Sequence, residues 1–332
     1  MSPVRSIIPM LAGLALFGCA PTAETGAGDA AGEAQPVADL RILSADDMQG
    51  RQVGTPGNAR ARDYLEARYG EIGLEMIGDS YSHGFDFSRR IDFRDPDSER
   101  VQMHGLNVIG MIEGSSDSDA VIVVTAHYDH LGPGDGEIFN GADDNASGVA
   151  AILAVGEALM QAPPLHDVMI VAFDAEEGGL NGARAFVESP PVEVGRIAFN
   201  LNLDMLGYSP DGDLWAVGGY HYPVLEPLIS ELATRAPVEL KMGFDRPTED
   251  RRNDWTLLSD HAPFHLAGIP FVYLGVEDHE HYHQVSDEFE TIPLDFFLGA
   301  VETSVMMVRA VDAELANITA APSRAALEAA GE

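Results

Sequence analysis

Lysine and cysteine are almost missing from this sequence: Lys241 and Cys19 are the only residues of their types among 332. A Schiff-base or phosphate-loop enzyme would have to use Lys241, which no glycine-rich loop precedes. Thiol enzymes, disulfide frameworks and cysteine-ligated zinc sites would all need cysteines other than the one near the N-terminus. Any catalytic chemistry must therefore come from Asp, Glu, His or hydroxyl side chains.

Positive charge is also scarce. The 54 Asp and Glu residues outnumber the 19 Lys and Arg residues and give a formal net charge of −35. Such acidity disfavours nucleic acid or an anionic membrane surface as a partner. The hydrophobic fraction of 45% is that of an ordinary globular protein, and the length allows one large domain or two ordinary ones.

Residues 1–18 have the pattern of an export signal, with Arg5, a short apolar stretch from Ile7 to Phe17, and Gly18 before Cys19. The stretch is too short to span a membrane as a mature helix. Its end also resembles the lipobox of bacterial lipoproteins, in which the cysteine is lipidated. We therefore expect a protein anchored by lipid at Cys19 to the bacterial cell envelope, facing the periplasm or the cell surface. The alternative is a plain cleaved signal with an incidental cysteine, and hence secretion.

Segments of low complexity lie at both ends of the remaining chain. Residues 19–38 are mostly Ala, Gly, Pro and acidic residues, which predicts a flexible tether behind the lipidated cysteine. The Ala-rich residues 316–332 predict a flexible tail. Residues 39–315 remain as the folded domain.

Within this domain, apolar runs of strand length alternate with helical patterns. We expect strands at 106–112, 120–126, 168–173, 197–203 and 270–274, and helices at 58–72, 149–160, 179–188, 223–233 and 294–315. Strands that are apolar throughout are typical of a sheet covered on both faces, so the pattern predicts an α/β sandwich. In open sheets of this kind, ligands bind beyond the carboxyl ends of the strands.

Clusters of His, Asp and Glu lie at the positions where such ligands would bind. They comprise His127 with Asp129, the run 140–148, Glu176 with Glu177 after Asp174, Asp204, and the run 279–287. Each cluster alone has an ordinary explanation, such as a helix cap or a solvated turn. Together they would require five coincidences. Carboxylates and imidazoles without thiolates suit catalytic zinc, or cobalt or manganese in its place.

Six segments, in this order and spacing, resemble the co-catalytic zinc peptidases of metallopeptidase family 28, which include aminopeptidases and glutamate carboxypeptidases. The segments are HYDHLG, FNGADDNASG, DAEEGGLNGA, NLDMLG, SDHAPFHLAGIP and HYHQVSD, and the likeness covers about residues 38–312. The resemblance implies a three-layer α/β/α sandwich with a mixed, mostly parallel sheet, the phosphorylase/hydrolase-like fold of zinc peptidases. It makes residues 39–315 a di-zinc peptidase domain.

The resemblance also implies five protein ligands for two Zn²⁺ ions. By the family pattern, Asp144 bridges both ions. His127 and Asp204 would complete the first site, and Glu177 and His283 would complete the second. The peptide bond after the bridging carboxylate is cis in this family.

Three further residues receive catalytic roles from the same pattern. Glu176 would be the general base, Asp129 would orient the first-site histidine, and Tyr282 would donate to the oxyanion. His279 and His281 share the face of the second-site histidine and are alternatives to it. The match of the pair at 282–283 to the family's Tyr-His favours His283.

The activity implied by the resemblance is that of a zinc-dependent exopeptidase on peptide substrates, as a monomer or dimer. Removal of one N-terminal residue is our first expectation, because free amines suit an acidic cleft and aminopeptidases dominate the bacterial branch. A glutamate carboxypeptidase-like dipeptidase would need a basic clamp, for which Arg246, Arg251 and Arg252 are candidates. A glutaminyl cyclase-like acyltransferase would use one zinc ion and depart from the Asp-Asp-Asn run at 143–145. Metal-free receptors of the family lose ligands that this sequence keeps.

The substrate pocket is less legible in the sequence. Candidates for its wall are Met205, Tyr220, Phe264 and Tyr273, and Asp260 with His261 is expected to line the cleft rather than bind metal.

Overall fold

The computed structural model describes residues 33–90, 97–134, 136–248 and 253–331. The expected export signal, Cys19, most of the expected tether, and the clamp candidates Arg251 and Arg252 lie outside these ranges. Within them, no helix is both long enough and apolar enough to span a membrane.

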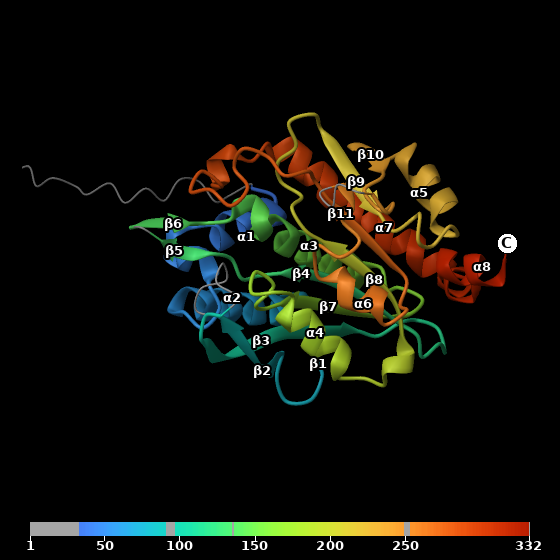
Figure 1. The fold of residues 1–332 in the computed structure, drawn as a ribbon, viewed down its shortest axis with the longest axis horizontal. Coiled ribbons are helices and arrows are strands. Elements are labelled where there is room, and N and C mark those ends of the chain that lie inside the picture. The colour runs from blue at the N-terminus through green and yellow to red at the C-terminus, as the bar shows by residue number, and fades with distance from the viewer. Residues whose placement is uncertain (1–32, 91–96, 135, 249–252, 332) are drawn as a thin grey trace, which may run out of the picture. The chain divides into compact units, whose positions relative to one another are not determined.

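A mixed nine-stranded sheet organises these residues in the order β1-β3-β7-β4-β8-β11-β9-β10, with β2 also paired to β3 (Figure 1). The strands are β1 (Glu75–Met76), β2 (Ser82–Arg90), β3 (Arg100–Ile112), β4 (Val121–His127), β7 (Asp167–Phe173), β8 (Ile197–Leu203), β9 (Asp213–Val217), β10 (Glu239–Met242) and β11 (Phe271–Gly275). A separate hairpin pairs β5 (Gly132–Gly134) with β6 (Glu137–Phe139).

The four central strands, β7, β4, β8 and β11, run parallel to one another. Parallel neighbours need crossover connections, which are usually helical. Here α3 (Gly148–Gln161) connects β4 to β7, and α4 (Asn181–Glu188) connects β7 to β8. The carboxyl ends of these strands therefore meet at one edge of the sheet.

Side chains along the buried strands point alternately to the two faces of the sheet, and helices cover the core on each face. Ile122 and Val124 of β4 belong to the larger core, whereas Val121 and Val123 belong to the smaller one. The larger core is covered by α3 together with α1 (Gln35–Leu43), α2 (Pro56–Ile72), α5 (Leu225–Ala233) and α7 (Leu294–Ala320). The smaller core is covered by α4 and α6 (His261–Leu266). The predicted three-layer α/β/α sandwich is confirmed (Figure 1).

Local sequence explains where α2 begins and ends. The Thr55 side chain caps the helix by accepting a hydrogen bond from the Asn58 amide, and Pro56 occupies the first turn, where no amide partner is needed. Gly73 ends the helix at a φ of 89°, a left-handed conformation that glycine adopts without steric cost.

The structure is more ordered at both ends of the domain than we expected. Helix α1 begins at Gln35, inside the expected tether, because Val37 and Leu40 bury their side chains in the larger core. Helix α7 continues to Ala320, and α8 (Arg324–Ala330) follows it in the expected tail. Ile318 is buried and the Arg324 amide donates to His221 O, so packing orders these residues despite their composition.

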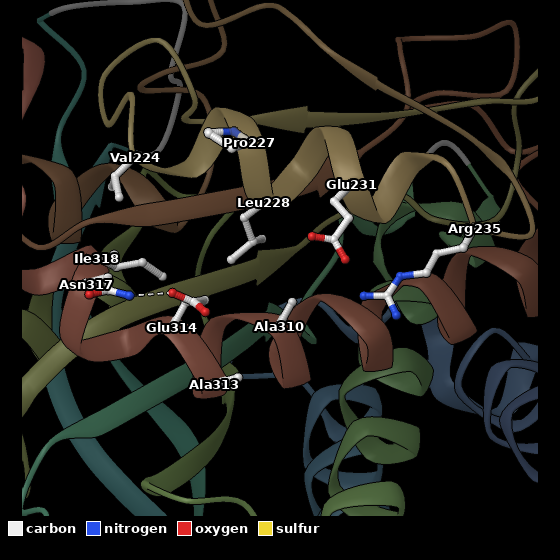
Figure 2. Close-up of a pocket in the computed structure, with 10 residues that line it drawn as sticks. All are labelled: Val224, Pro227, Leu228, Glu231, Arg235, Ala310, Ala313, Glu314, Asn317 and Ile318. Carbon is white, nitrogen blue, oxygen red and sulfur yellow. Dashed lines mark hydrogen bonds between the residues drawn. The ribbon is translucent and has the colours of Figure 1, made fainter.

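A groove of about 350 Å³ lies between α5 and α7 (Figure 2). Its wall combines apolar side chains such as Leu228 and Ile318 with the charged Glu231, Glu314 and Arg235. None of the residues predicted to bind metal or substrate lines this groove.

Candidate metal centre

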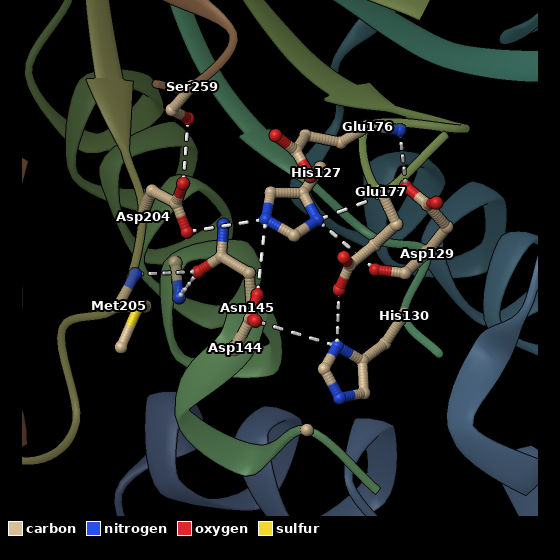
Figure 3. Close-up of polar contacts among 12 residues, drawn as sticks. His127, Asp129, His130, Asp144, Asn145, Glu176, Glu177, Asp204, Met205 and Ser259 are labelled. Carbon is tan, nitrogen blue, oxygen red and sulfur yellow. Dashed lines mark hydrogen bonds and ion pairs between the residues drawn. The ribbon is translucent and has the colours of Figure 1, made fainter. Parts of the chain in front are cut away.

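Four of the predicted ligands, His127, Asp144, Glu177 and Asp204, lie together beyond the carboxyl ends of the central strands (Figure 3), and His283 lies beside them. His127 is the last residue of β4, Asp204 follows β8 directly, and Glu177 lies in the loop after β7. Asp144 lies in the turn that enters α3, and His283 lies in the segment after β11. Sequence positions far apart thus converge because four parallel strands end at the same edge.

His127, Asp144 and Asp204 form the first group of donors, and all three side chains are buried. The distance from His127 Nε2 is 3.4 Å to Asp144 Oδ1 and 3.3 Å to Asp204 Oδ1. Donor atoms that lie about 2.0–2.1 Å from one tetrahedral zinc ion are about 3.3 Å apart. The chemistry and spacing of this group therefore fit a zinc ion.

The other carboxylate oxygen of Asp144 faces a second group. His283 Nε2 lies 3.1 Å from Asp144 Oδ2 and 3.4 Å from Glu177 Oε2. These distances fit a second ion by the same criterion. The two carboxylate oxygens of Asp144 thus face different groups of donors.

The two alternative histidines have other partners. His279 Nε2 lies 2.8 Å from Asp143 Oδ2, and both side chains are almost fully buried. His281 Nδ1 lies 2.9 Å from Ser286 Oγ. Of the three histidines in this segment, His283 contacts Asp144 and Glu177.

His130 belongs to the second group, although the sequence analysis did not select it. Its Nδ1 lies 2.8 Å from Glu177 Oε1 and 3.7 Å from Asp144 Oδ2, and its ring is buried. Gly141 makes room for this ring, since a Cβ there would lie 2.5 Å from it. The signal was present in the sequence as a second histidine three residues after His127.

The backbone oxygen and the carboxylate of Asp129 have different partners. His127 Nδ1 lies 3.1 Å from the backbone oxygen of Asp129 but 3.9 Å from its carboxylate. Strand β4 ends at His127, so Asp129 lies in the loop that follows it. The carbonyl is placed to accept from Nδ1–H, which leaves Nε2 free as a ligand. The carboxylate instead accepts from the Glu176 amide at 2.9 Å (Figure 3).

Hydrogen bonds from buried side chains fix the turn that carries Asp144. The carboxylate of Asp287 accepts from the amides of Asp143 and Asp144 at 2.8 and 3.0 Å. The peptide bond between Asp144 and Asn145 is cis, as the resemblance implied. The Asn145 side chain donates to Leu203 O at 3.0 Å and so ties this turn to the end of β8.

The adjacent carboxyl groups of Glu176 and Glu177 have different electrostatic environments. Burial tends to raise the pKa of Glu177, but His130 and His283 outweigh it and hold this pKa below its usual range. Burial raises the pKa of Glu176 well above its usual range, against the opposing effect of His127. Neighbouring acids whose pKa values are shifted apart are typical of sites that carry out proton transfer.

The candidates for substrate contact and for the oxyanion differ in how deeply they are buried. The Tyr282 ring stacks on His283 with 3.9 Å between centroids, which places it beside the second group. Phe264 packs in the smaller core against Phe173 and is not a wall of an open pocket. Asp260 and His261 are fully buried rather than exposed in a cleft.

The other wall candidates have contacts of their own. The Tyr273 hydroxyl donates to Asp204 O at 3.1 Å, behind the first group. Met205 follows Asp204 and is buried. The Tyr220 ring is covered by the guanidinium of Arg324 at 4.1 Å.

The sequence is similar to a family of known proteins. Residues 107–308 match the sequence pattern of peptidase family M28. The chain is similar to aminopeptidase YwaD of Bacillus subtilis (strain 168), with 33% identity over 183 residues that cover 52% of this chain and 37% of YwaD. It is 33% identical over 173 residues to the probable lipoprotein aminopeptidase LpqL of Mycobacterium tuberculosis, covering 49% of this chain and 33% of LpqL.

Solved structures show the same fold. The crystal structure of BSAP, a zinc aminopeptidase from Bacillus subtilis, matches with a TM-score of 0.66 at 18% identity, covering 82% of this chain and 94% of that one. The alignments with YwaD and LpqL span about a third of those proteins' own lengths. Since the matched pattern covers more than half of the 332 residues, the chain belongs to peptidase family M28.

Proposed function

We propose that this protein is a zinc-dependent aminopeptidase that hydrolyses the N-terminal peptide bond of peptides. The observation that carries the proposal is the pair of donor groups that share Asp144, with one carboxylate oxygen facing each group. His127 and Asp204 would hold one zinc ion with Asp144, and Glu177 and His283 would hold a second. The aminopeptidases among the similar proteins support the same activity.

The bound ions and the side chains around them would have separate roles in peptide hydrolysis. Bound zinc would supply the positive charge that makes water acidic near neutral pH and that stabilises an oxyanion. Glu176 would accept the proton of the attacking water and pass it to the leaving amine. The Asp129 carboxylate would hold the Glu176 loop by accepting a hydrogen bond from the Glu176 amide, and Tyr282 would donate to the oxyanion.

The choice of a free-amine substrate over a free-carboxylate one is supported by the aminopeptidases among the similar proteins. The carboxypeptidase alternative needs a basic clamp for the substrate carboxylate. Of its candidates, Arg246 lies over the Tyr220 ring at 5.6 Å, and Arg251 and Arg252 lie outside the described residues.

A substrate panel combined with metal analysis tests this function. We expect the full chain to bind two zinc ions and to release nitroaniline from aminoacyl-nitroanilides, while N-acylated dipeptides remain intact. Cleavage of the blocked dipeptides alone would favour the carboxypeptidase. One zinc ion per chain, with conversion of N-terminal glutamine to pyroglutamate, would favour the acyltransferase.

We further propose that the protein is exported and anchored by lipid at Cys19, with residues 1–18 removed and the segment before Ala34 acting as a tether. The lipobox-like sequence and the similarity to LpqL, named as a probable lipoprotein, support this proposal. We expect a bacterial host to incorporate labelled palmitate into the protein and to retain it in the membrane fraction. The Cys19→Ser variant should lose both properties. Equal labelling of the two proteins would contradict the anchor.

A further inference from the structure

Arg51 is a fully buried cation directly behind the metal centre. Its guanidinium donates to backbone carbonyl oxygens on three separate segments of the chain. Nη1 donates to Leu43 O at 2.7 Å, at the end of α1. Since burying a charged group is costly unless it is compensated, this arrangement requires an explanation.

The other three carbonyls belong to the loops that carry metal donors. Nε donates at 2.9 Å to the oxygen of Tyr128, the residue after His127. Nη1 and Nη2 donate to Asn140 O and Gly141 O at 2.6 and 2.9 Å, just before the turn that contains Asp144. One side chain therefore joins the His127 loop to the Asp144 loop.

A neighbouring contact extends this link to the third donor loop. The Asn58 side chain donates to Arg51 O at 3.1 Å and to Asp174 Oδ1 at 2.9 Å. Asp174 begins the loop that contains Glu176 and Glu177. The segment from Arg51 to Asn58 thus holds three of the loops that form the centre.

Nearby carboxylates favour the positive charge of Arg51, which burial disfavours. Burial lowers its pKa to about 10, while Asp144, Asp287, Asp129 and Glu177 act in the opposite direction. The side chain therefore remains cationic at neutral pH. In the protein without metal it is a positive charge behind a cluster of carboxylates that repel one another.

We propose that Arg51 is a positioning residue of the metal centre. It holds the loops of His127 and Asp144 at metal-binding spacing, and its charge offsets the repulsion among the carboxylates before the ions bind. This inference rests on the proposed function, because it requires that the donors bind divalent cations. It also makes a segment outside the matched residues 107–308 part of the functional unit.

Zinc affinity of the full chain tests the proposal, measured by competition with a chromophoric chelator. We expect Arg51→Lys to weaken zinc binding by about 10- to 100-fold, the usual effect of losing a residue that supports metal ligands. Lysine keeps the charge but cannot reach four carbonyls at once. Arg51→Gln keeps a planar pair of N–H donors without the charge, and it should weaken binding by a similar or larger factor.

Arg68 provides the matched control. It is also a buried arginine of the same helical layer, but it pairs with the carboxylates of Asp39 and Glu157 instead of the donor loops. Arg68→Lys should lower thermal stability without changing zinc affinity. The absorption spectrum of the cobalt-substituted protein should change in the Arg51 variants and stay unchanged in the control.

The possible results separate this inference from the proposed function. Wild-type zinc affinity and an unchanged cobalt spectrum in both Arg51 variants would overturn the positioning role. An equal loss of affinity in Arg68→Lys would also overturn it, since the effect would then follow general stability. If the wild-type chain itself binds no zinc or cleaves no peptide, the proposed function fails, whatever the variants show. If Arg51→Lys does not fold, the zinc affinity of Arg51→Gln tests the positioning role by itself.

Discussion

Glu176→Gln is expected to lower kcat by about 10²- to 10⁴-fold while the protein keeps its zinc, because positioned general acid–base catalysis contributes a factor of this size. Glutamine has nearly the same shape as glutamate, but it cannot accept the proton of the attacking water. The hydrogen bond that holds this loop, from the residue's own amide to Asp129 Oδ1, uses the backbone and survives the substitution. Initial rates on an aminoacyl-nitroanilide, measured together with zinc content, give the result.

The adjacent residue provides a control for this experiment. Glu177 faces His130 and His283 as a donor, so Glu177→Gln should lose zinc as well as activity. Glu188→Gln, at the exposed end of α4, should change neither. A rate for Glu176→Gln close to that of the wild type would exclude Glu176 as the general base.

Removal of metal is expected to abolish activity and to destabilise the fold. Asp144, Glu177 and Asp204 are brought together around three imidazoles, and without cations their charges repel. A ligand present at about 1,000 times its dissociation constant stabilises the folded state by about 4 kcal/mol. We therefore expect chelation to lower the free energy of unfolding by about this amount. Thermal denaturation with and without chelator measures the change.

Restoration completes the experiment on metal removal. Adding zinc back should recover both the melting temperature and the activity. Asp144→Asn weakens the bridging group, so this variant should be inactive and should gain little stability from zinc. Identical melting curves for the wild-type chain with and without chelator would show that no bound cation stabilises the fold.

Much of the metal centre could be predicted from the sequence because parallel strands impose a simple rule. Residues that follow buried strands converge at one edge of the sheet, so His127 and Asp204 could be placed together without coordinates. The choice of His283 over its two neighbours rested on the family pattern. In the structure, His279 contacts Asp143 and His281 contacts Ser286, whereas His283 lies beside Asp144.

Other features depend on backbone geometry that a linear pattern does not contain. In the loop after β4, the Asp129 carbonyl faces His127 and its carboxylate faces the Glu176 amide. In the same loop, His130 lies beside Glu177. Segments that looked flexible by composition are helical because a few side chains, such as Leu40 and Ile318, reach the core.

The sequence by itself determined the kind of chemistry available. A chain with one lysine and one cysteine, and with acids and histidines after its buried strands, has oxygen and imidazole ligands to offer and little else. Only the tertiary structure decided which of these side chains meet, and that Arg51 joins their loops from a segment nearly 80 residues before Tyr128. The physical reason is that ligand type is a local property of each residue. Spacing within a metal centre arises from loops whose buried backbone groups must find hydrogen-bond partners across the fold.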